Sequence, residues 1–177
     1  KVVNLTDRFF DPGSVEVQGR HIRCWKAGGH GSQSFQEVVE NSCNVGFVNV
    51  GLKLGSDSFY DYLNAFGLGQ LTNIDLAGEA KGIMIDKTKV KPLDIATMSM
   101  GQSIAVTPIQ LATAVAAVAN DGQRLRPQIV REVRDQKGDV ILGFKPDIVK
   151  QVVDPQTAKE VKKVLESVVE NGTGRSA

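Results

Sequence analysis

The stretch T-P-I-Q-L-A-T-A-V-A-A-V-A-N-D-G, residues 107–122, is the clearest structural signal in the sequence. Thr107 is a favourable N-cap, Pro108 suits the first helical position, and Gln110 completes a capping box. Residues 120–122 end the helix. Because the body between these signals is small and apolar on every face, it predicts a helix that is buried on all sides of a larger domain. Other elements of the chain must therefore cover it.

Five more helices are predicted around this one. Ser34 and Glu37 form a second capping box, and that helix runs to about Asn41. The next helix spans residues 45–54 and ends at Gly55, and further helices span about 57–66, 92–101 and 155–170. The apolar positions that we expect to face inward are Phe47, Val48 and Leu52, then Phe59, Tyr62, Leu63 and Phe66, and in the last helix Val161, Leu165 and Val168.

Extended segments are short. The sequence predicts one hairpin around Gly19 and a second one turned at Lys137-Gly138, with a loop over residues 70–91. Gly28, Gly29 and Gly31 predict a flexible loop. Five or six helices with two short hairpins and no long central strand indicate an α+β fold that is mainly a helical lobe.

Composition excludes several classes of protein. The chain has 177 residues, 41% of them hydrophobic and 23% charged, with a net charge of +1. These values are typical of one globular domain and argue against disorder and against a nucleic-acid-binding surface. The two cysteines and two histidines do not have the spacing of a zinc motif, so we expect no metal site and no cofactor.

Residues 41–44, N-S-C-N, place a hydroxyl, a thiol and an amide inside an apolar helical pattern. On spacing alone, Ser42 and Asn44 are best explained as residues that end one helix and begin another. Two other polar or glycine-rich sites are weaker. His30 in G-G-H-G is more often a structural hydrogen-bonding group than a general base, and Gly67-Leu68-Gly69 lacks the strand and the third glycine of a dinucleotide loop.

Several blocks nevertheless occur in an order that is typical of one family. They are F-F-D-P-G from Phe9, C-W-K-A-G-G-H-G from Cys24, the helix leading into N-S-C-N, F-G-L-G-Q-L-T-N-I-D-L-A-G-E-A-K-G from Phe66, G-Q-S-I-A-V-T-P-I-Q-L-A from Gly101, and V-V-E-N-G-T-G-R-S-A at the end. From about residue 9 onward, the sequence resembles the transpeptidase domain of class B penicillin-binding proteins, in particular the sporulation type.

The resemblance implies the penicillin-binding-protein and serine β-lactamase-like fold, with most of its central sheet missing from this piece. That family uses three motifs, S-x-x-K, S-x-N and K-T-G, and only the middle one is present here. Ser14 is followed three positions later by Val17, and Asn171 stands where a K-T-G motif would have its lysine. We therefore expect residues 1–177 to be an internal fragment between the outer two motifs, inactive alone.

For the site, the resemblance implies that Ser42 and Asn44 are catalytic residues of a peptidoglycan D,D-transpeptidase. Ser42 would hydrogen-bond the lysine of S-x-x-K and help to protonate the leaving amine, while Asn44 would donate to the substrate's peptide carbonyl. The implied ligands are peptidoglycan stem peptides and β-lactams. The implied partners are the remaining segments of the domain and a cell-wall glycosyltransferase. The parent would lie on the extracytoplasmic face of the membrane, held by an N-terminal helix.

Two other functions stay open at this point. The domain could have lost catalysis and only recognise partners in cell-wall synthesis, although the intact S-x-N argues against this. It could also be a β-lactamase or receptor of the same fold, which faster deacylation would reveal.

Cys24 and Cys43 form a candidate redox pair. Cys43 lies between Ser42 and Asn44, and Cys24 lies 19 residues earlier in the glycine-rich region. In an oxidising compartment such a pair can form a disulfide, worth about 3 kcal/mol in the chain-entropy model. A thioredoxin-like reductant would then reopen it. The alternative is that the two cysteines are unrelated small apolar residues.

Overall fold

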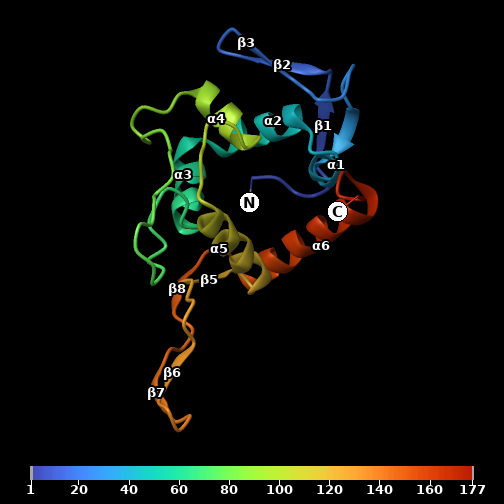
Figure 1. The fold of residues 1–177 in the computed structure, drawn as a ribbon. Coiled ribbons are helices and arrows are strands. Elements are labelled where there is room, and N and C mark those ends of the chain that lie inside the picture. Colours follow the sequence, from blue (N-terminus) through green and yellow to red (C-terminus); the bar gives the residue numbers. More distant parts are fainter. Residues whose placement is uncertain (1, 177) are drawn as a thin grey trace. The chain divides into compact units, whose positions relative to one another are not determined.

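The computed structural model describes residues 2–176, which form six helices and eight short strands (Figure 1). In chain order these are β1 (Arg8–Asp11), β2 (Ser14–Val17), β3 (Arg20–Arg23), β4 (Gly31–Ser34), α1 (Phe35–Glu40), α2 (Asn44–Leu54), α3 (Ser56–Ala65), α4 (Pro92–Ser99), α5 (Pro108–Ala119), β5 (Gln123–Leu125), β6 (Glu132–Arg134), β7 (Val140–Gly143), β8 (Ile148–Gln151) and α6 (Pro155–Asn171). The mixture of helices and small sheets confirms the α+β prediction.

The strands pair as four two-stranded antiparallel sheets within the described residues: β1 with β4, β2 with β3, β5 with β8, and β6 with β7. The predicted hairpins around Gly19 and Gly138 are the β2–β3 and β6–β7 pairs. Gln18 and Gly19 have φ of 49° and 75°, the left-handed values that a two-residue hairpin turn requires. The β5–β8 pair was not predicted, since its strands are separated by the whole β6–β7 hairpin.

The chain divides into two compact units, of which the first contains residues 1–61, 84–104 and 160–177. Its core joins α2 and α4 to the β2–β3 hairpin through Val17, Ile22, Val48 and Ala96. Gly51 lets the two helices approach closely, because a Cβ at that position would lie only 1.7 Å from Ser99 Oγ. A second cluster, described with the site below, packs α1 against α2.

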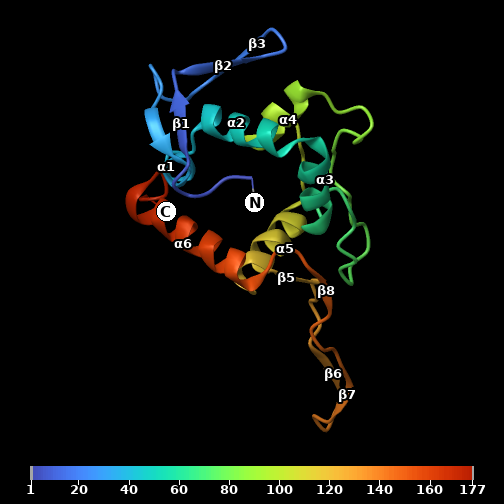
Figure 2. The ribbon, with the colours of Figure 1, turned by 180° about the vertical axis from the view of Figure 1, so that it is seen from behind.

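The second unit contains residues 62–83 and 105–159, with α5 as its main helix. The Thr107–Gln110 capping box and Pro108 start α5 as predicted. Buried Gln110 also donates from Nε2 to the carbonyls of Gln70 and Lys81, at 2.6 and 2.9 Å, so it fastens the long loop to the helix. The β6–β7 hairpin projects away from β5 and β8 in both views (Figures 1 and 2).

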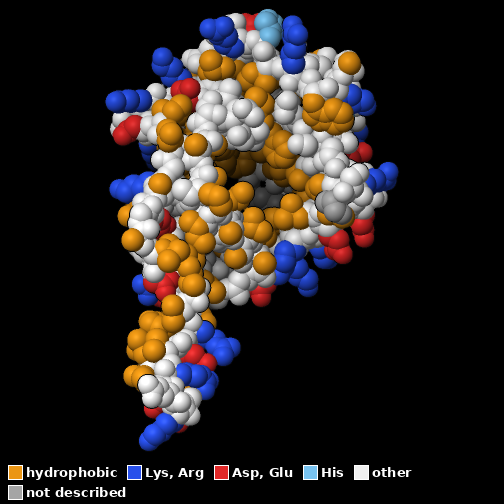
Figure 3. Space-filling model, in the orientation of Figure 1, with side chains coloured by type: hydrophobic (Ala, Val, Ile, Leu, Met, Phe, Trp, Pro, Cys, Tyr) orange, Lys and Arg blue, Asp and Glu red, His pale blue; other side chains and the backbone are white. Residues whose placement is uncertain are grey.

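The prediction that α5 is buried on all sides is wrong for these residues. Thr113 and Ala117 are buried, but Leu111 and Val115 are 55% and 59% exposed. Within residues 2–176 no element covers that face. Hydrophobic side chains also gather on the projecting hairpin (Figure 3), where Val140, Ile141 and Leu142 are exposed.

Four predicted inward positions elsewhere are also wrong. Leu52 and Tyr62 are exposed, and α3 instead buries Tyr60, whose hydroxyl donates to the carbonyl of Ile85 at 2.6 Å. In α6 the buried residues are Ala158, Val164 and Ser167, whereas Val161 and Leu165 are exposed. None of the helices in the described part of the chain is long and apolar enough to cross a membrane.

Candidate functional site

The N-S-C-N stretch forms a tight turn between α1 and α2. The backbone N–H groups of Ser42 and Cys43 donate to the carbonyls of Val39 and Val38, so the chain reverses directly at the end of α1. Ser42 has φ of 49°, a left-handed conformation that is uncommon for a residue other than glycine. Its side chain is exposed. The turn therefore presents the Ser42 hydroxyl to solvent on a strained backbone.

Cys43 fixes this turn to the core of the protein. It is the N-cap of α2, its Sγ accepts a hydrogen bond from the N–H of Gly46 at 3.4 Å, and it is fully buried against Val38 and Val45. Asn44 then begins α2, and its Nδ2 donates to the carbonyl of Arg23 at 3.0 Å. The two predicted catalytic residues thus lie on either side of one buried thiol.

The loop after β3 braces the turn from outside. Trp25 Nε1 donates to the carbonyl of Asn41 at 2.8 Å, and Asn41 Nδ2 donates to Gln33 Oε1 at 3.1 Å. Because these bonds involve the residue just before Ser42, the position of the turn depends on the conformation of the glycine-rich loop.

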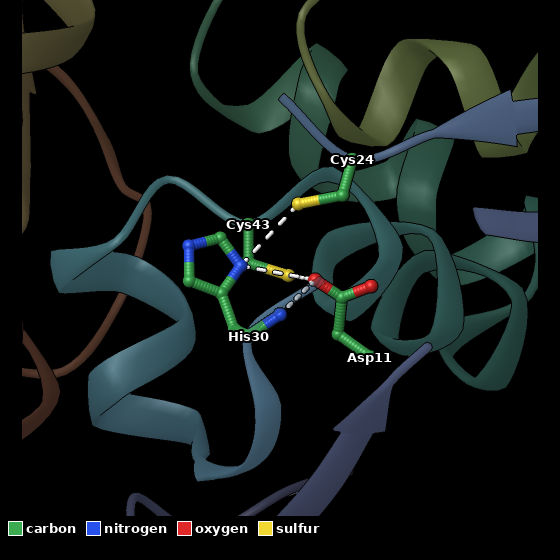
Figure 4. A group of neighbouring side chains, drawn as sticks. All are labelled: Asp11, Cys24, His30 and Cys43. Atoms are coloured by element: carbon green, nitrogen blue, oxygen red, sulfur yellow. Dashed lines mark hydrogen bonds and ion pairs between the residues drawn. The ribbon is translucent and has the colours of Figure 1, made fainter. Parts of the chain in front are cut away.

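Four side chains converge behind the turn, as Figure 4 shows: Asp11, Cys24, His30 and Cys43. Asp11 Oδ2 lies 2.9 Å from His30 Nδ1 and 3.3 Å from Cys43 Sγ, and Cys24 Sγ lies 3.3 Å from His30 Nδ1. One ligand atom from each residue lies within 4.8 Å of the other three. The second ring nitrogen of His30, Nε2, is buried and has no hydrogen-bond partner among the residues described.

Glycine geometry makes this convergence possible. Gly29 has φ of 78°, and a Cβ there would lie 2.3 Å from the Asp11 carbonyl oxygen. Only glycine permits this close approach of the loop to the end of β1. As a result the N–H of His30 reaches Asp11 Oδ2 at 2.9 Å, while the N–H of Gly13 holds Oδ1 at 2.8 Å.

The environment of the cluster favours the ionised form of the carboxylate and the neutral form of the thiols. Burial alone would raise the pKa of Asp11, but hydrogen bonds from Cys24, Gly13 and His30 outweigh it and hold that pKa well below its usual range. Burial raises the pKa of the Cys43 thiol to about 11, and burial followed by the Asp11 carboxylate raises the pKa of Cys24. At neutral pH the cluster therefore contains one carboxylate and two neutral thiols.

The cluster was missed in the sequence because its members are separated by 13, 6 and 13 positions, which matches no familiar metal motif. The expectation of no metal site considered only the spacing of the two cysteines and two histidines and stays a prediction, whereas the folded chain brings together four side chains that could hold an ion. The glycines around His30 and the turn after Asp11 are the signals that could have indicated a built loop. The predicted redox pair is brought together, with both cysteines present as free thiols.

The chain is similar to known proteins along its whole length. The family model of the penicillin-binding protein transpeptidase domain matches residues 1–177. Stage V sporulation protein D of Bacillus subtilis is 46% identical over 177 residues, which are 99% of this chain and 27% of that protein. Penicillin-binding protein PbpB of Mycobacterium tuberculosis is 31% identical over 94% of this chain and 25% of that protein. The chain thus spans about a quarter of the length of these relatives.

Solved structures agree with this similarity. A D,D-transpeptidase domain from Eggerthella lenta has a TM-score of 0.89 at 26% identity and covers 98% of this chain and 45% of that one. Penicillin-binding protein 3 from Mycobacterium tuberculosis, solved with aztreonam, has a TM-score of 0.85 at 29% identity and covers 97% of this chain and 38% of that one. Because the family model covers every residue and the fold agrees over almost all of the chain, this chain belongs to the penicillin-binding protein transpeptidase domain family.

Proposed function

We propose that this chain is the segment of a peptidoglycan D,D-transpeptidase between the S-x-x-K and K-T-G motifs, and that Ser42 and Asn44 form one wall of its catalytic cleft. The observation that carries the proposal is the S-x-N turn itself. Ser42 is exposed on a left-handed backbone beside the first turn of α2, in a chain that belongs to this family. The left-handed backbone of Ser42 is also the one that ends α1 in a Schellman motif, so the support for a catalytic role comes from the S-x-N sequence at this turn together with the family.

The reaction is acyl transfer to and from a serine that lies outside this chain. The serine hydroxyl attacks the penultimate D-alanine carbonyl of a stem peptide, and the terminal D-alanine leaves as an amine. A second amine, from a neighbouring stem peptide, then attacks the acyl-enzyme ester and releases the serine. Each step moves one proton between oxygen and nitrogen, so a hydroxyl close to the lysine base can relay it.

The two residues divide this work. Ser42 relays the proton between the lysine of S-x-x-K and the departing amine. Asn44 uses one N–H on the carbonyl of Arg23 in this structure, which leaves its second N–H for the peptide carbonyl of the substrate and its Oδ1 for the lysine. A β-lactam follows the same first step, because its strained amide replaces the D-alanine bond.

We further propose that Cys24 and Cys43 regulate this site. Closing a disulfide between them would pull the thiol that anchors the turn, and so displace Ser42 and Asn44. The sulfur atoms lie within 4.8 Å of each other, so a modest side-chain movement would reach the bonding distance of about 2.05 Å. A thioredoxin-like reductant would reverse the bond on the extracytoplasmic side of the membrane, where the substrate lies.

Labelling with a fluorescent penicillin tests the proposal. The complete transpeptidase domain that includes these residues should form a covalent adduct and release D-alanine from a stem-peptide analogue. The 177-residue chain alone should form none, because no serine in it is followed three positions later by lysine. An adduct on the chain alone, or a complete domain that binds partners without acylation, would contradict the proposal. Rapid loss of the adduct would instead indicate a β-lactamase.

A further inference from the structure

We propose that Asp11, Cys24, His30 and Cys43 bind a single Zn²⁺ ion, and that this metal-bound state and the Cys24–Cys43 disulfide exclude each other. The donor set is two sulfurs, one imidazole nitrogen and one carboxylate oxygen. Zn²⁺ accepts all three kinds of ligand, and sulfur and imidazole favour it over Mg²⁺ or Ca²⁺. The four residues come from the end of β1, the two ends of the glycine-rich loop and the N-cap of α2.

The spacing of the ligand atoms is close to that of a tetrahedral site. Zinc bonds of about 2.0–2.3 Å place the ligand atoms of a tetrahedron about 3.3–3.8 Å apart. Here Cys24 Sγ lies 3.3 Å from His30 Nδ1, and Cys43 Sγ lies 3.3 Å from Asp11 Oδ2. The distance of 2.9 Å between Asp11 and His30 is a hydrogen bond that the ion would replace. The remaining pairs of ligand atoms lie within 4.8 Å of each other, so side-chain shifts of up to about 1 Å bring all four to tetrahedral spacing.

Backbone N–H groups already donate hydrogen bonds to side-chain atoms of the cluster. Gly13 and His30 donate to the two oxygens of Asp11, and Gly46 donates to Cys43 Sγ. Lys26 supplies the corresponding N–H for Cys24. Donors of this kind orient metal ligands and stabilise the charge on sulfur. The site is therefore built by the fold and does not depend on the chance meeting of surface groups.

Burial and charge also favour an ion. The side chains of Asp11 and His30 are 1% and 4% exposed, and Cys43 is 0% exposed. A buried carboxylate is costly unless a positive charge compensates it. Zn²⁺ supplies that charge and releases the two thiol protons, which leaves two thiolates, a carboxylate and a neutral imidazole around the ion.

The same two thiols are needed for the disulfide, so the two states compete. A small-molecule disulfide such as oxidised glutathione can take two electrons from the zinc-bound thiolates. The products are the Cys24–Cys43 bond, two glutathione thiolates and free Zn²⁺. The first thiolate attacks the S–S bond of the oxidant and expels one glutathione thiolate, which leaves a mixed disulfide. The second thiolate then attacks that mixed disulfide, forms the Cys24–Cys43 bond and expels the second glutathione thiolate. Zinc therefore protects the reduced turn, and oxidation ejects zinc.

Cobalt substitution tests the site on the reduced 177-residue chain. Co²⁺ should bind with one-to-one stoichiometry, with the strong visible absorption of a tetrahedral ion and a near-ultraviolet thiolate-to-cobalt band, and Zn²⁺ should displace it. Cys24→Ser, His30→Gln and Asp11→Asn should each weaken binding by about 10–100-fold or more. His21→Gln is the matched control, because His21 is the second histidine and lies exposed on β3.

A second measurement does not depend on variants that could misfold. Zn²⁺ should slow alkylation of both thiols in the unmodified chain, and oxidised glutathione should release the ion in step with disulfide formation. Octahedral Co²⁺ spectra, alkylation that is unaffected by Zn²⁺, or a disulfide that forms with the ion still bound would each overturn the proposal. Its failure leaves the transpeptidase proposal intact, since that is tested by penicillin acylation.

A separate observation in the second unit points to a carboxylate-binding site. Arg124, on β5, is only 9% exposed, and its side chain makes no hydrogen bond or ion pair among the described residues, with Nε buried. Its Nη1 packs beside Gly67, where a Cβ would lie only 2.2 Å away. An arginine keeps its charge when buried, so an unpaired one calls for an anion.

Arg124 is also one of the residues that line a pocket of about 390 Å³ between residues 70–73 and strands β5 and β8. The other charges in its lining, Arg126 and Asp147, pair with each other at 3.0 Å. The uncompensated charge in the pocket is therefore that of Arg124. We infer that the pocket accepts the free carboxylate of a small ligand or peptide, which a planar guanidinium can bind with two hydrogen bonds.

Titration with acetate, followed through the side-chain Nε–H signals of the arginines by NMR, tests this inference. Acetate should shift the Arg124 signal saturably, and chloride at equal ionic strength should not. Arg124→Gln should abolish the saturable acetate shifts of the backbone amides that line the pocket, while the control Arg131→Gln, next to the exposed hairpin, should keep them together with the Arg124 signal. A linear response to both salts would show screening only, and preferential binding of inorganic phosphate would refute the carboxylate assignment.

Discussion

Replacing Ser42 separates the two explanations of the S-x-N turn, because this residue carries both a candidate proton relay and a strained backbone. With φ of 49°, Ser42 occupies the left-handed region, where a residue with a Cβ costs about 1–2 kcal/mol. Ser42→Ala keeps that strain and removes the hydroxyl. Ser42→Gly removes both, since glycine adopts this conformation freely.

In the complete transpeptidase domain, both variants should be acylated by penicillin about 10²–10⁴-fold more slowly, the usual loss when a proton-transfer partner is removed. The stabilities of the two variants should not fall in the same way as their acylation rates. Because the side chain is exposed, Ser42→Ala should change the free energy of unfolding by less than about 0.5 kcal/mol. Ser42→Gly should be equally stable or up to about 1 kcal/mol more stable.

Stopped-flow acylation with a fluorescent penicillin and urea unfolding give the two measurements. Ser14→Ala is the control, since Ser14 begins the S-x-x-V sequence that lacks a lysine. If both Ser42 variants were acylated at the wild-type rate, Ser42 would be only a helix-terminating residue. If their rates fell in proportion to a loss of stability, the turn would matter through its conformation and the proton relay would be refuted.

Three further outcomes follow from the structure. Gln110→Ala should lower the free energy of unfolding by about 3 kcal/mol, because it removes three hydrogen bonds of a buried side chain at about 1 kcal/mol each, one of them in the capping box of α5. Chemical denaturation measures this. The 177-residue chain should self-associate through the exposed apolar face of α5, which light scattering checks; a chain that stays monomeric at high concentration would contradict this. Burial favours the neutral form of Glu79, but hydrogen bonds from Thr72 and Asn73 outweigh burial and lower the pKa of its carboxyl group. The carboxylate therefore stabilises the fold fully above the unfolded pKa of about 4.3. This stabilisation is lost as the pH falls through the lower folded pKa. Melting temperatures of the Glu79→Gln variant should therefore depend less on pH between about 5 and 3 than those of the unmodified chain.

Helix starts were predictable from the sequence because their causes are local. The capping boxes at Ser34 and Thr107 join residues three positions apart, and both are present in the structure. Faces of helices were less predictable, since burial depends on partners that are distant in the chain. Ser167 is buried in α6 because Gln36 and Glu40 of α1 offer it hydrogen bonds, and apolar Leu165 is left outside.

The candidate site shows the same difference between features with local causes and features that depend on distant parts of the chain. Ser42 and Asn44 could be named only because several sequence blocks together resemble one family, since the three-residue motif alone favoured a helix terminus, and they lie on one turn. The sequence did not predict that the Asp11 carboxylate and the His30 imidazole lie beside the two thiols. These two residues reach Cys43 only through the close contact of Gly29 with the end of β1. That contact depends on left-handed glycines in a loop, and sequence spacing does not encode where such a loop closes.

The turn and the four-residue cluster are two faces of one structural element. Gly46 lies directly against Val38, and a Cβ there would come within 2.5 Å of it, so α1 and α2 meet without room for adjustment. The N–H of Gly46 in turn holds Cys43 Sγ. A change in the bonding of that sulfur, whether to zinc, to a proton or to Cys24, cannot be absorbed by moving α2 closer to α1. It must be taken up by the residues next to Cys43, which are Ser42 and Asn44.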